Sequence, residues 1–224
     1  MNQTLPKSLR IALVDDHILI RDALANIVDS FEDCTVCILA SNGREFIDKL
    51  QFGIIPHLVI LDLMMPEMDG YETAKWLRSN YPDMYILMLS MYDSELATIR
   101  LLQSGVRGFL KKDVHPSELQ QAIETTMRTG YYYSSSTSTK LVKLLKTGDS
   151  KTPLVNSITL NEKEMQFLKL ASADMTYKEI AQIMEMRPRT IDNYRDALFT
   201  KLNVKSRVGL VLFAIKNGVV SIGY

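Results

Sequence analysis

Charged and hydroxyl side chains follow four of the short apolar runs in the first half of the chain. These side chains are Asp15 and Asp16 after Ile11–Val14, Asp62 after Leu58–Leu61, Ser90 after Tyr85–Leu89, and Lys111 and Lys112 after Arg107–Leu110. If the runs are parallel strands of one sheet, their carboxyl ends share an edge, where functional groups gather in such folds. Three carboxylates, a hydroxyl and an ammonium group would then converge.

This combination of groups predicts phosphoryl chemistry. Clustered carboxylates repel one another unless a cation lies among them, and an all-oxygen ligand set suits Mg²⁺. A carboxylate beside that ion can attack a phosphoryl group, while an ammonium and a hydroxyl stabilise the transferring oxygens. The alternative is that each residue only begins a loop or caps a helix. Their joint placement favours a site.

The elements that must position these groups alternate between apolar runs and helical patterns. Five runs are separated or followed by segments of helical period, which predicts a doubly wound α/β fold with a five-stranded parallel sheet. Besides the four runs above, Thr35–Leu39 is the fifth, and the helical stretches include Ile18–Asp29, Gly70–Ser79, Asp93–Gln103 and Pro116–Arg128. We expect this domain to span residues 8–128.

The second half of the chain has a different pattern. Residues 129–156 contain a Ser/Thr cluster, a short Lys/Leu helix and a Gly/Asp/Ser/Pro stretch, which is typical of a linker. Residues 157–224 show no strand pattern and predict a small all-α domain of four helices. Capping boxes at Asn161 and Thr176 open two of them. Tyr177–Met184, a short turn and Pro188 predict helix, turn, helix.

Composition adds limits on the function. The 224 residues carry no net formal charge, but residues 1–130 sum to −6 and residues 131–224 to +6. The basic half fits a polyanionic partner. The chain has neither an apolar run of secretory length nor a membrane-spanning one, so we expect a cytoplasmic protein without a membrane partner.

Cys34 and Cys37 lie in strand sequence, on opposite faces. The histidines, His17, His57 and His115, show no metal-ligand grouping.

The first half resembles the receiver domain of two-component response regulators of the NarL/FixJ type, a flavodoxin-like fold. The resemblance lies in Val14-Asp15-Asp16-His17, Leu61-Asp62-Leu63-Met64-Met65-Pro66, Leu89-Ser90 and Phe109-Leu110-Lys111-Lys112-Asp113. It implies that Asp62 is the phospho-acceptor and that Mg²⁺ is held directly by Asp16, Asp62 and the carbonyl of Met64, with Asp15 contributing mainly through water. It also implies that Lys112 is the functional lysine, and that Ser90 and Phe109 form the switch. Alternatively, Phe109 is simply a core residue.

The second half resembles the LuxR-type helix-turn-helix domain. The resemblance lies in Lys178-Glu179-Ile180-Ala181, Arg189-Thr190-Ile191-Asp192-Asn193-Tyr194, Lys201-Leu202-Asn203-Val204 and Ser206-Arg207. It implies that the helix after Pro188 enters the major groove. The expected DNA-binding residues are Lys178, Arg187, Arg189, Thr190, Asp192, Asn193, Arg195, Lys201, Lys205 and Arg207. The last helix, with Val208, Val211, Leu212 and Ile215, is similar to the family's dimerisation helix.

These resemblances imply a transcription factor rather than an enzyme. They imply that a partner histidine kinase phosphorylates Asp62 and that this phosphorylation controls homodimer formation and binding to double-stranded DNA. One alternative is a protein-interaction switch without DNA binding, since Asp192 and Tyr194 stand where the family usually has Lys and His, and Asp196 adds a further acid. Another is a phosphatase or a flavodoxin-like redox protein. Against these, Met64 stands where a haloacid-type nucleophile would have its second Asp, and no phosphate loop for flavin follows the first strand.

Replacing Asp62 tests the predicted phospho-acceptor. Asp62→Asn is expected to fold normally but to form no acid-labile acyl phosphate with a small phosphodonor and Mg²⁺, because an amide lacks the nucleophilic carboxylate. Intact mass and circular dichroism measure the two properties. An unchanged response to the phosphodonor would remove Asp62 from the mechanism.

Overall fold

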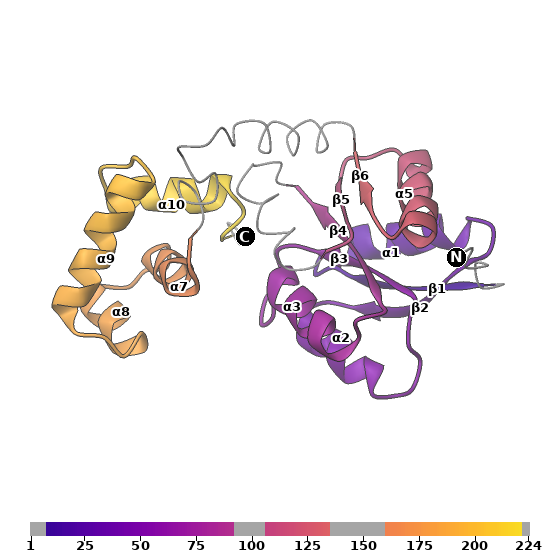
Figure 1. The fold of residues 1–224 in the computed structure, drawn as a ribbon, viewed down its shortest axis with the longest axis horizontal. Coiled ribbons are helices and arrows are strands. Elements are labelled where there is room, and N and C mark those ends of the chain that lie inside the picture. The colour runs from indigo at the N-terminus through magenta and orange to yellow at the C-terminus, as the bar shows by residue number, and fades with distance from the viewer. Residues whose placement is uncertain (1–7, 92–105, 135–159, 221–224) are drawn as a thin grey trace. The chain divides into compact units, whose positions relative to one another are not determined.

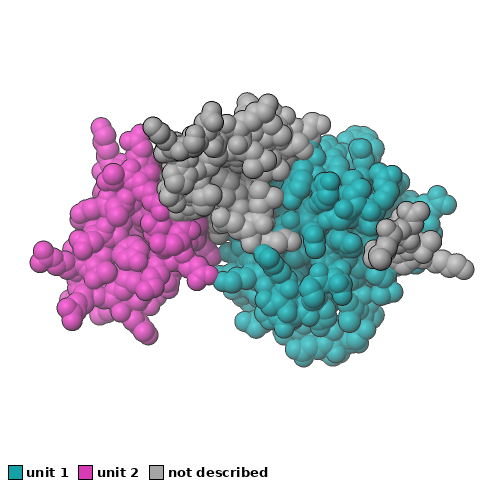
Figure 2. Space-filling view, in the orientation of Figure 1, with its two compact units in different colours: residues 1–93, 98–140 teal, residues 94–97, 141–224 magenta. Residues whose placement is uncertain are grey.

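The computed structural model describes residues 8–91, 106–134 and 160–220 (Figure 1). The chain divides into two compact units (Figure 2). The described residues up to 134 belong to the first unit and those from 160 to the second. The predicted linker, 129–156, falls largely outside the described residues, so its bounds remain a prediction. No helix in the described ranges is long and apolar enough to cross a membrane.

The first unit contains a parallel sheet with the strand order β2-β1-β3-β4-β5-β6. The strands are β1 (Leu9–Val14), β2 (Cys34–Ala40), β3 (Leu58–Asp62), β4 (Tyr85–Ser90), β5 (Gly108–Lys111) and β6 (Tyr132–Tyr133). The chain thus winds outward from β1 in both directions, and the predicted doubly wound fold is confirmed. The central strand β3 is buried along its whole length, as expected for a strand covered on both faces.

The predicted number of five strands was wrong, because the sheet has a sixth. β6 contains only two residues, which pair in parallel with Gly108 and Phe109 of β5. The sequence after β6 continues into a Ser/Thr-rich segment, a composition that is typical of a linker. A two-residue strand has no measurable periodicity, and its existence depends on the open backbone edge of β5.

Helices cover both faces of the sheet and divide its core into two layers. The helices are α1 (Ile18–Asp29), α2 (Gly43–Leu50), α3 (Gly70–Asn80) and α5 (Pro116–Thr129). α2 and α3 contribute Phe46, Leu50, Ala74 and Leu77 to one layer, and α1 and α5 contribute Val28, Leu119 and Ile123 to the other. The predicted helix Asp93–Gln103 lies outside the described residues.

Strand β2 confirms the prediction for the two cysteines. Cys34 packs against the core layer of α1 and α5, whereas Cys37 packs against the layer of α2 and α3. The pairing of β1 and β2 shifts register beside Cys37, so this residue and Ile38 both belong to the same layer. The thiols therefore lie on opposite faces and are both free.

The second unit has the four predicted helices. They are α7 (Glu162–Ala171), α8 (Tyr177–Ile183), α9 (Pro188–Lys201) and α10 (Arg207–Lys216). Asn161 and Thr176 form complete capping boxes with Glu164 and Glu179. These boxes satisfy backbone N–H groups that a helix start leaves without partners. The buried residues Phe167, Ile180, Ile191, Leu198 and Leu210 bring all four helices around one core.

Gly70 generates a prediction about the loop after β3. A Cβ at this first residue of α3 would lie 2.3 Å from the backbone oxygen of Asp62 and 3.0 Å from Cα of Leu63. Backbone atoms cannot move away cheaply, so Gly70→Ala is expected to destabilise the first unit by about 1–3 kcal/mol. Urea unfolding measures the change. Ser79→Ala, on the exposed end of the same helix, is the control, and equal stability of both variants would contradict the close approach.

Candidate functional site

Strand ends bring together two buried carboxylates and one buried ammonium group. Asp15 follows β1, and Asp62 ends the neighbouring strand β3. The Lys112 ammonium lies 2.8 Å from Oδ2 of Asp15 and 3.0 Å from Oδ2 of Asp62. All three side chains are only 4% exposed. The predicted convergence at one sheet edge is therefore present for these residues.

Lys112 reaches this position across the end of β4. β4 lies between β3 and β5 in the sheet, and Ser90 at its end is completely buried. The backbone N–H of Lys112 donates to the carbonyl of Ser90 at 3.0 Å. A long side chain anchored beside a small residue can extend to Asp62 at the end of β3, two strands away, and to Asp15 after β1, the next strand. The structure thus brings Ser90 into the same neighbourhood.

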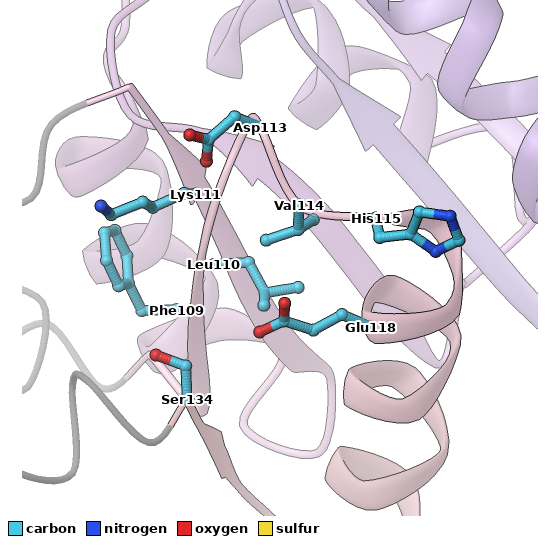
Figure 3. A pocket seen from close by; sticks show the side chains of 8 residues that line it. All are labelled: Phe109, Leu110, Lys111, Asp113, Val114, His115, Glu118 and Ser134. Atoms are coloured by element: carbon cyan, nitrogen blue, oxygen red, sulfur yellow. The ribbon is translucent and has the colours of Figure 1, made fainter.

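The two adjacent lysines point in different directions. Figure 3 shows Lys111 beside Phe109 on one side of β5, with Leu110 on the other side. Both Phe109 and Lys111 line a pocket that also contains Asp113 and Ser134. The Lys112 ammonium contacts both Asp15 and Asp62. Position after the strand alone did not show whether Lys111 or Lys112 enters the pocket. The resemblance favoured Lys112, and the structure places the Lys112 ammonium beside Asp15 and Asp62.

Phe109 is a core residue in this conformation. Its side chain is 3% exposed and packs with Val59, Ile86, Met88 and Val106. This arrangement agrees with the alternative of a core role. The switch role of Phe109 stays a prediction.

The acidic pocket also includes His17, which the sequence interpretation excluded. Asp15, Asp16, Asp62 and His17 can each offer one ligand atom, all within 4.8 Å of one another. Nδ1 of His17 lies 3.2 Å from Oδ1 of Asp15 and 2.9 Å from Oδ1 of Asp16. The statement that no histidine belongs to a metal-ligand grouping was therefore wrong for His17. Its position directly after Asp16 indicates that it lies near the pocket, whereas its contact with Asp15 depends on the conformation of the loop after β1.

The donor set fits a hard divalent cation. Three carboxylates and one ammonium sum to −2, and carboxylate oxygen is the ligand that Mg²⁺ prefers. Asp16 is 32% exposed, so water can reach the pocket from its side and complete the coordination of an ion that keeps several waters. Met64 is half-buried, and the ligand role of its carbonyl remains a prediction.

Arg21 is a supporting residue that sequence reasoning missed. Its Nη1 donates to the carbonyl of Asp15 at 3.2 Å and to Oγ of Ser41 at 2.8 Å. The guanidinium thereby ties the loop after β1 to the loop after β2. The N–H of Asp15 also donates to the carbonyl of Ala40 at 3.0 Å, so these contacts together fix the backbone that presents Asp15 and Asp16. An arginine three residues into a helix carries no sequence signal for this contact.

Burial dominates the ionisation of Asp62. Desolvation raises the pKa of this carboxyl to about 6 from its ordinary value of 3.8. The Lys112 charge acts in the opposite direction, and the Asp15 charge adds to the rise. Asp62 is therefore ionised at neutral pH, but at a cost in solvation that a bound cation can offset.

The predicted DNA-binding residues fall into two groups in the second unit. The exposed ones are Lys178, Arg187, Arg189, Asn193 and Lys205, while Thr190, Asp192, Arg195, Lys201 and Arg207 are half-buried. Three cations of the second group have partners within the unit. Lys201 pairs with Glu164 at 2.8 Å, Arg207 donates to the carbonyls of Ala171 and Ala173, and Arg195 contacts both Asp192 and Asp196. Their DNA contacts remain predictions.

Comparison with known families identifies both units. Residues 11–124 match the family model of the response regulator receiver domain, and residues 159–214 match that of bacterial regulatory proteins of the luxR family. The chain therefore belongs to the response regulators of the NarL/FixJ type, which join a receiver domain to a LuxR-type DNA-binding domain.

Full-length relatives share this organisation. The transcriptional regulatory protein MctR of Rhizobium johnstonii is 30% identical over 217 residues, covering 95% of this chain and 96% of that protein. The response regulator UvrY of Escherichia coli K12 is 25% identical and covers 94% and 95%. Among solved structures, RcsB of Salmonella enterica serovar Typhimurium bound to promoter rprA with phosphomimetic BeF₃⁻ has a TM-score of 0.68 at 22% identity, covering 92% of this chain and 98% of that chain.

The raised pKa of Asp62 predicts a pH-dependent stability. Between about pH 4 and 6 the unfolded state loses the Asp62 proton while the folded state keeps it, so wild-type stability falls as pH rises through this window. Asn imitates the protonated carboxyl. With Mg²⁺ chelated, Asp62→Asn is expected to be more stable than wild type at pH 7, by about 3 kcal/mol at most.

Chemical denaturation at pH 3.5 and pH 7 checks this expectation. The advantage of the variant should almost disappear at the lower pH, where Asp62 is protonated in the folded state and mostly protonated in the unfolded state. Asp16→Asn, at the more exposed carboxylate, is the matched control. Equal stability of Asp62→Asn and wild type at pH 7 would show that the folded protein ionises Asp62 without cost.

Proposed function

We propose that this response regulator is a transcription factor controlled by phosphorylation of Asp62 by a partner histidine kinase. The observation that carries the proposal is the buried Asp62 carboxylate beside Asp15 and Lys112, in a domain that matches the receiver family. The proposed domains are residues 8–128 and 157–224, joined by a linker, and the proposed compartment is the cytoplasm.

The pocket residues have separate roles in phosphoryl transfer. A carboxylate oxygen of Asp62 attacks phosphorus as the P–N bond of the kinase phosphohistidine breaks and histidine keeps the electron pair. Asp15, Asp16, Asp62 and the Met64 carbonyl would hold Mg²⁺, which supplies charge stabilisation of the phosphoryl oxygens. Lys112 supplies a further positive charge there, and the Ser90 hydroxyl a hydrogen bond. No separate substrate is turned over, although the pocket can assist loss of its own phosphate.

The acquired charge is the proposed signal. A phosphoryl group adds about −1.5 to −2 charge at neutral pH, with strong acceptor oxygens. These oxygens attract Lys112 and Ser90, which changes the packing around Phe109. Val208 and Leu212 on α10 are 66% and 62% exposed and lie about one turn apart. This exposed apolar pair supports α10 as a homodimer contact of the activated protein.

Binding of double-stranded DNA is proposed for the second unit. α8 and α9 form a helix-turn-helix, whose second helix enters the major groove in such domains. The exposed cations Lys178, Arg187, Arg189 and Lys205 are suited to phosphates, and Asn193 to a base edge. RcsB, which has the same fold, was solved on promoter DNA and as two dimers on two parallel DNAs.

A protein-interaction switch is the second candidate function. Its specific support is the acidity of α9, where Asp192 and Asp196 are 51% and 64% exposed. Acidic groups on a groove-facing helix oppose approach to a polyanion. This candidate predicts weak binding to every duplex, with little dependence on salt.

One DNA-selection experiment separates the two candidates. Purified full-length wild type and Asp62→Asn are incubated with fragmented genomic DNA, with and without a small phosphodonor and Mg²⁺. The proposed function predicts enrichment of a two-fold-symmetric site that the phosphodonor strengthens only in wild type. Absence of enrichment in every condition would contradict DNA binding and favour the interaction switch.

A further inference from the structure

We propose that Asp192 and Asp196 read cytosine in the major groove and that Arg195 positions their carboxylates for this contact. The inference rests on the proposed DNA binding of the second unit and specifies part of the sequence that it recognises. It gives a base-reading role to the acidic residues that otherwise argue against DNA binding.

Arg195 forms a bridge between the two acidic residues. Its Nη1 donates to Oδ1 of Asp192 at 3.0 Å, and its Nε donates to Oδ1 of Asp196 at 2.8 Å. The arginine side chain is 28% exposed, compared with 51% for Asp192 and 64% for Asp196. The guanidinium is thus the more covered group, and the carboxylates are the groups presented to solvent.

The core of the unit holds this arginine in place. The Arg195 guanidinium lies over the ring of Tyr177, 5.4 Å from its centroid. Tyr177 stacks in turn on the fully buried Phe167, with centroids 6.1 Å apart and planes inclined by 6°. Because α8 and the core fix the arginine, the arginine fixes the carboxylates that it bridges. Such support by packed neighbours is what accurate recognition requires.

The bridge also reduces the electrostatic cost of placing acid near DNA. Two carboxylates and one guanidinium sum to −1 instead of −2. The exposed Lys178, Arg187 and Arg189 supply attraction to phosphates, which acts on any sequence. Repulsion of the remaining charge is then tolerable where a base offers a compensating hydrogen bond.

The chemistry of a carboxylate selects the base. Arg195 engages Oδ1 of each residue, so Oδ2 of each can accept from a donor in the groove. Cytosine presents only its N4 amino donor there. Adenine also has an amino donor, but its neighbouring N7 is an acceptor, which a carboxylate cannot satisfy. Guanine and thymine present acceptors. Cytosine is therefore the base that suits both residues.

Helix geometry sets the separation of the two cytosines. Asp192 and Asp196 are four residues apart, about one turn or 5–6 Å along α9. Successive base pairs rise by about 3.4 Å. The two contacts therefore fall one or two base pairs apart in each half-site.

Selection from random duplexes by the full-length protein, with phosphodonor and Mg²⁺, tests this assignment. Wild type is expected to enrich two cytosines at this spacing. Asp192→Ala and Asp196→Ala should each lose about tenfold or more of the cytosine preference at one position and keep the other. Asp174→Ala, at an exposed acid outside α9, should select the wild-type site.

Arg195→Lys separates positioning from general charge. Lysine keeps the cation but presents one compact ammonium instead of the arginine fork. Selection at both cytosines should weaken, because one ammonium cannot bridge both carboxylates as the guanidinium does, and circular dichroism should show an unchanged fold.

Two results would overturn the assignment in distinguishable ways. Selection of the same site by wild type, Asp192→Ala and Asp196→Ala would reject base reading by these acids while leaving DNA binding intact. Failure of wild type and Asp174→Ala to enrich any site would reject the proposed function and this inference together.

Discussion

The contact of the Lys112 ammonium with Asp15 and Asp62 is the interaction on which the pocket depends. Two carboxylates this deeply buried could not both stay ionised without a nearby cation, because desolvation and mutual repulsion both favour protonation. The single Lys112 ammonium lies 2.8 Å from Oδ2 of Asp15 and 3.0 Å from Oδ2 of Asp62, and it stabilises the charge of both carboxylates. It still leaves an excess of negative charge in the pocket, which suits a divalent ion.

The strand order of the fold brings Lys112 within reach of both carboxylates. Parallel pairing places the ends of β1 and β3 side by side, and β5 follows beyond β4. Lysine is long enough to extend from β5 past the buried Ser90 to both carboxylates. Gly70 then lets α3 begin against the backbone of Asp62. Charge in the pocket and close backbone packing around it are therefore parts of one arrangement.

Much of this arrangement could be predicted from the sequence. The apolar runs predicted β1 to β5, since strands buried on both faces are short and continuously apolar, and the polar residues after them predicted the pocket. Capping boxes predicted the starts of α7 and α8. The sequence did not reveal β6, whose two residues depend on pairing with β5, or the approach of His17 to Asp15, which depends on the loop conformation after β1.

Partners of charged residues were the hardest feature to predict. Composition showed that the second half is basic, but Arg195, Lys201 and Arg207 find partners on their own unit. Lys201 and Glu164 are 37 residues apart in the chain, so only the packing of α7 against α9 makes them neighbours. Sequence spacing indicates which face of a helix a cation occupies, whereas its partner is a property of the folded unit.

A ¹³C NMR titration of the Asp62 carboxyl, in wild type and in Lys112→Met without Mg²⁺, tests the central claim most directly. The account predicts a pKa of about 6 in wild type and a clearly higher pKa in the variant, because the buried carboxylates lose their shared cation. A pKa that does not change on removal of the Lys112 charge would contradict the claim that this ammonium organises the pocket.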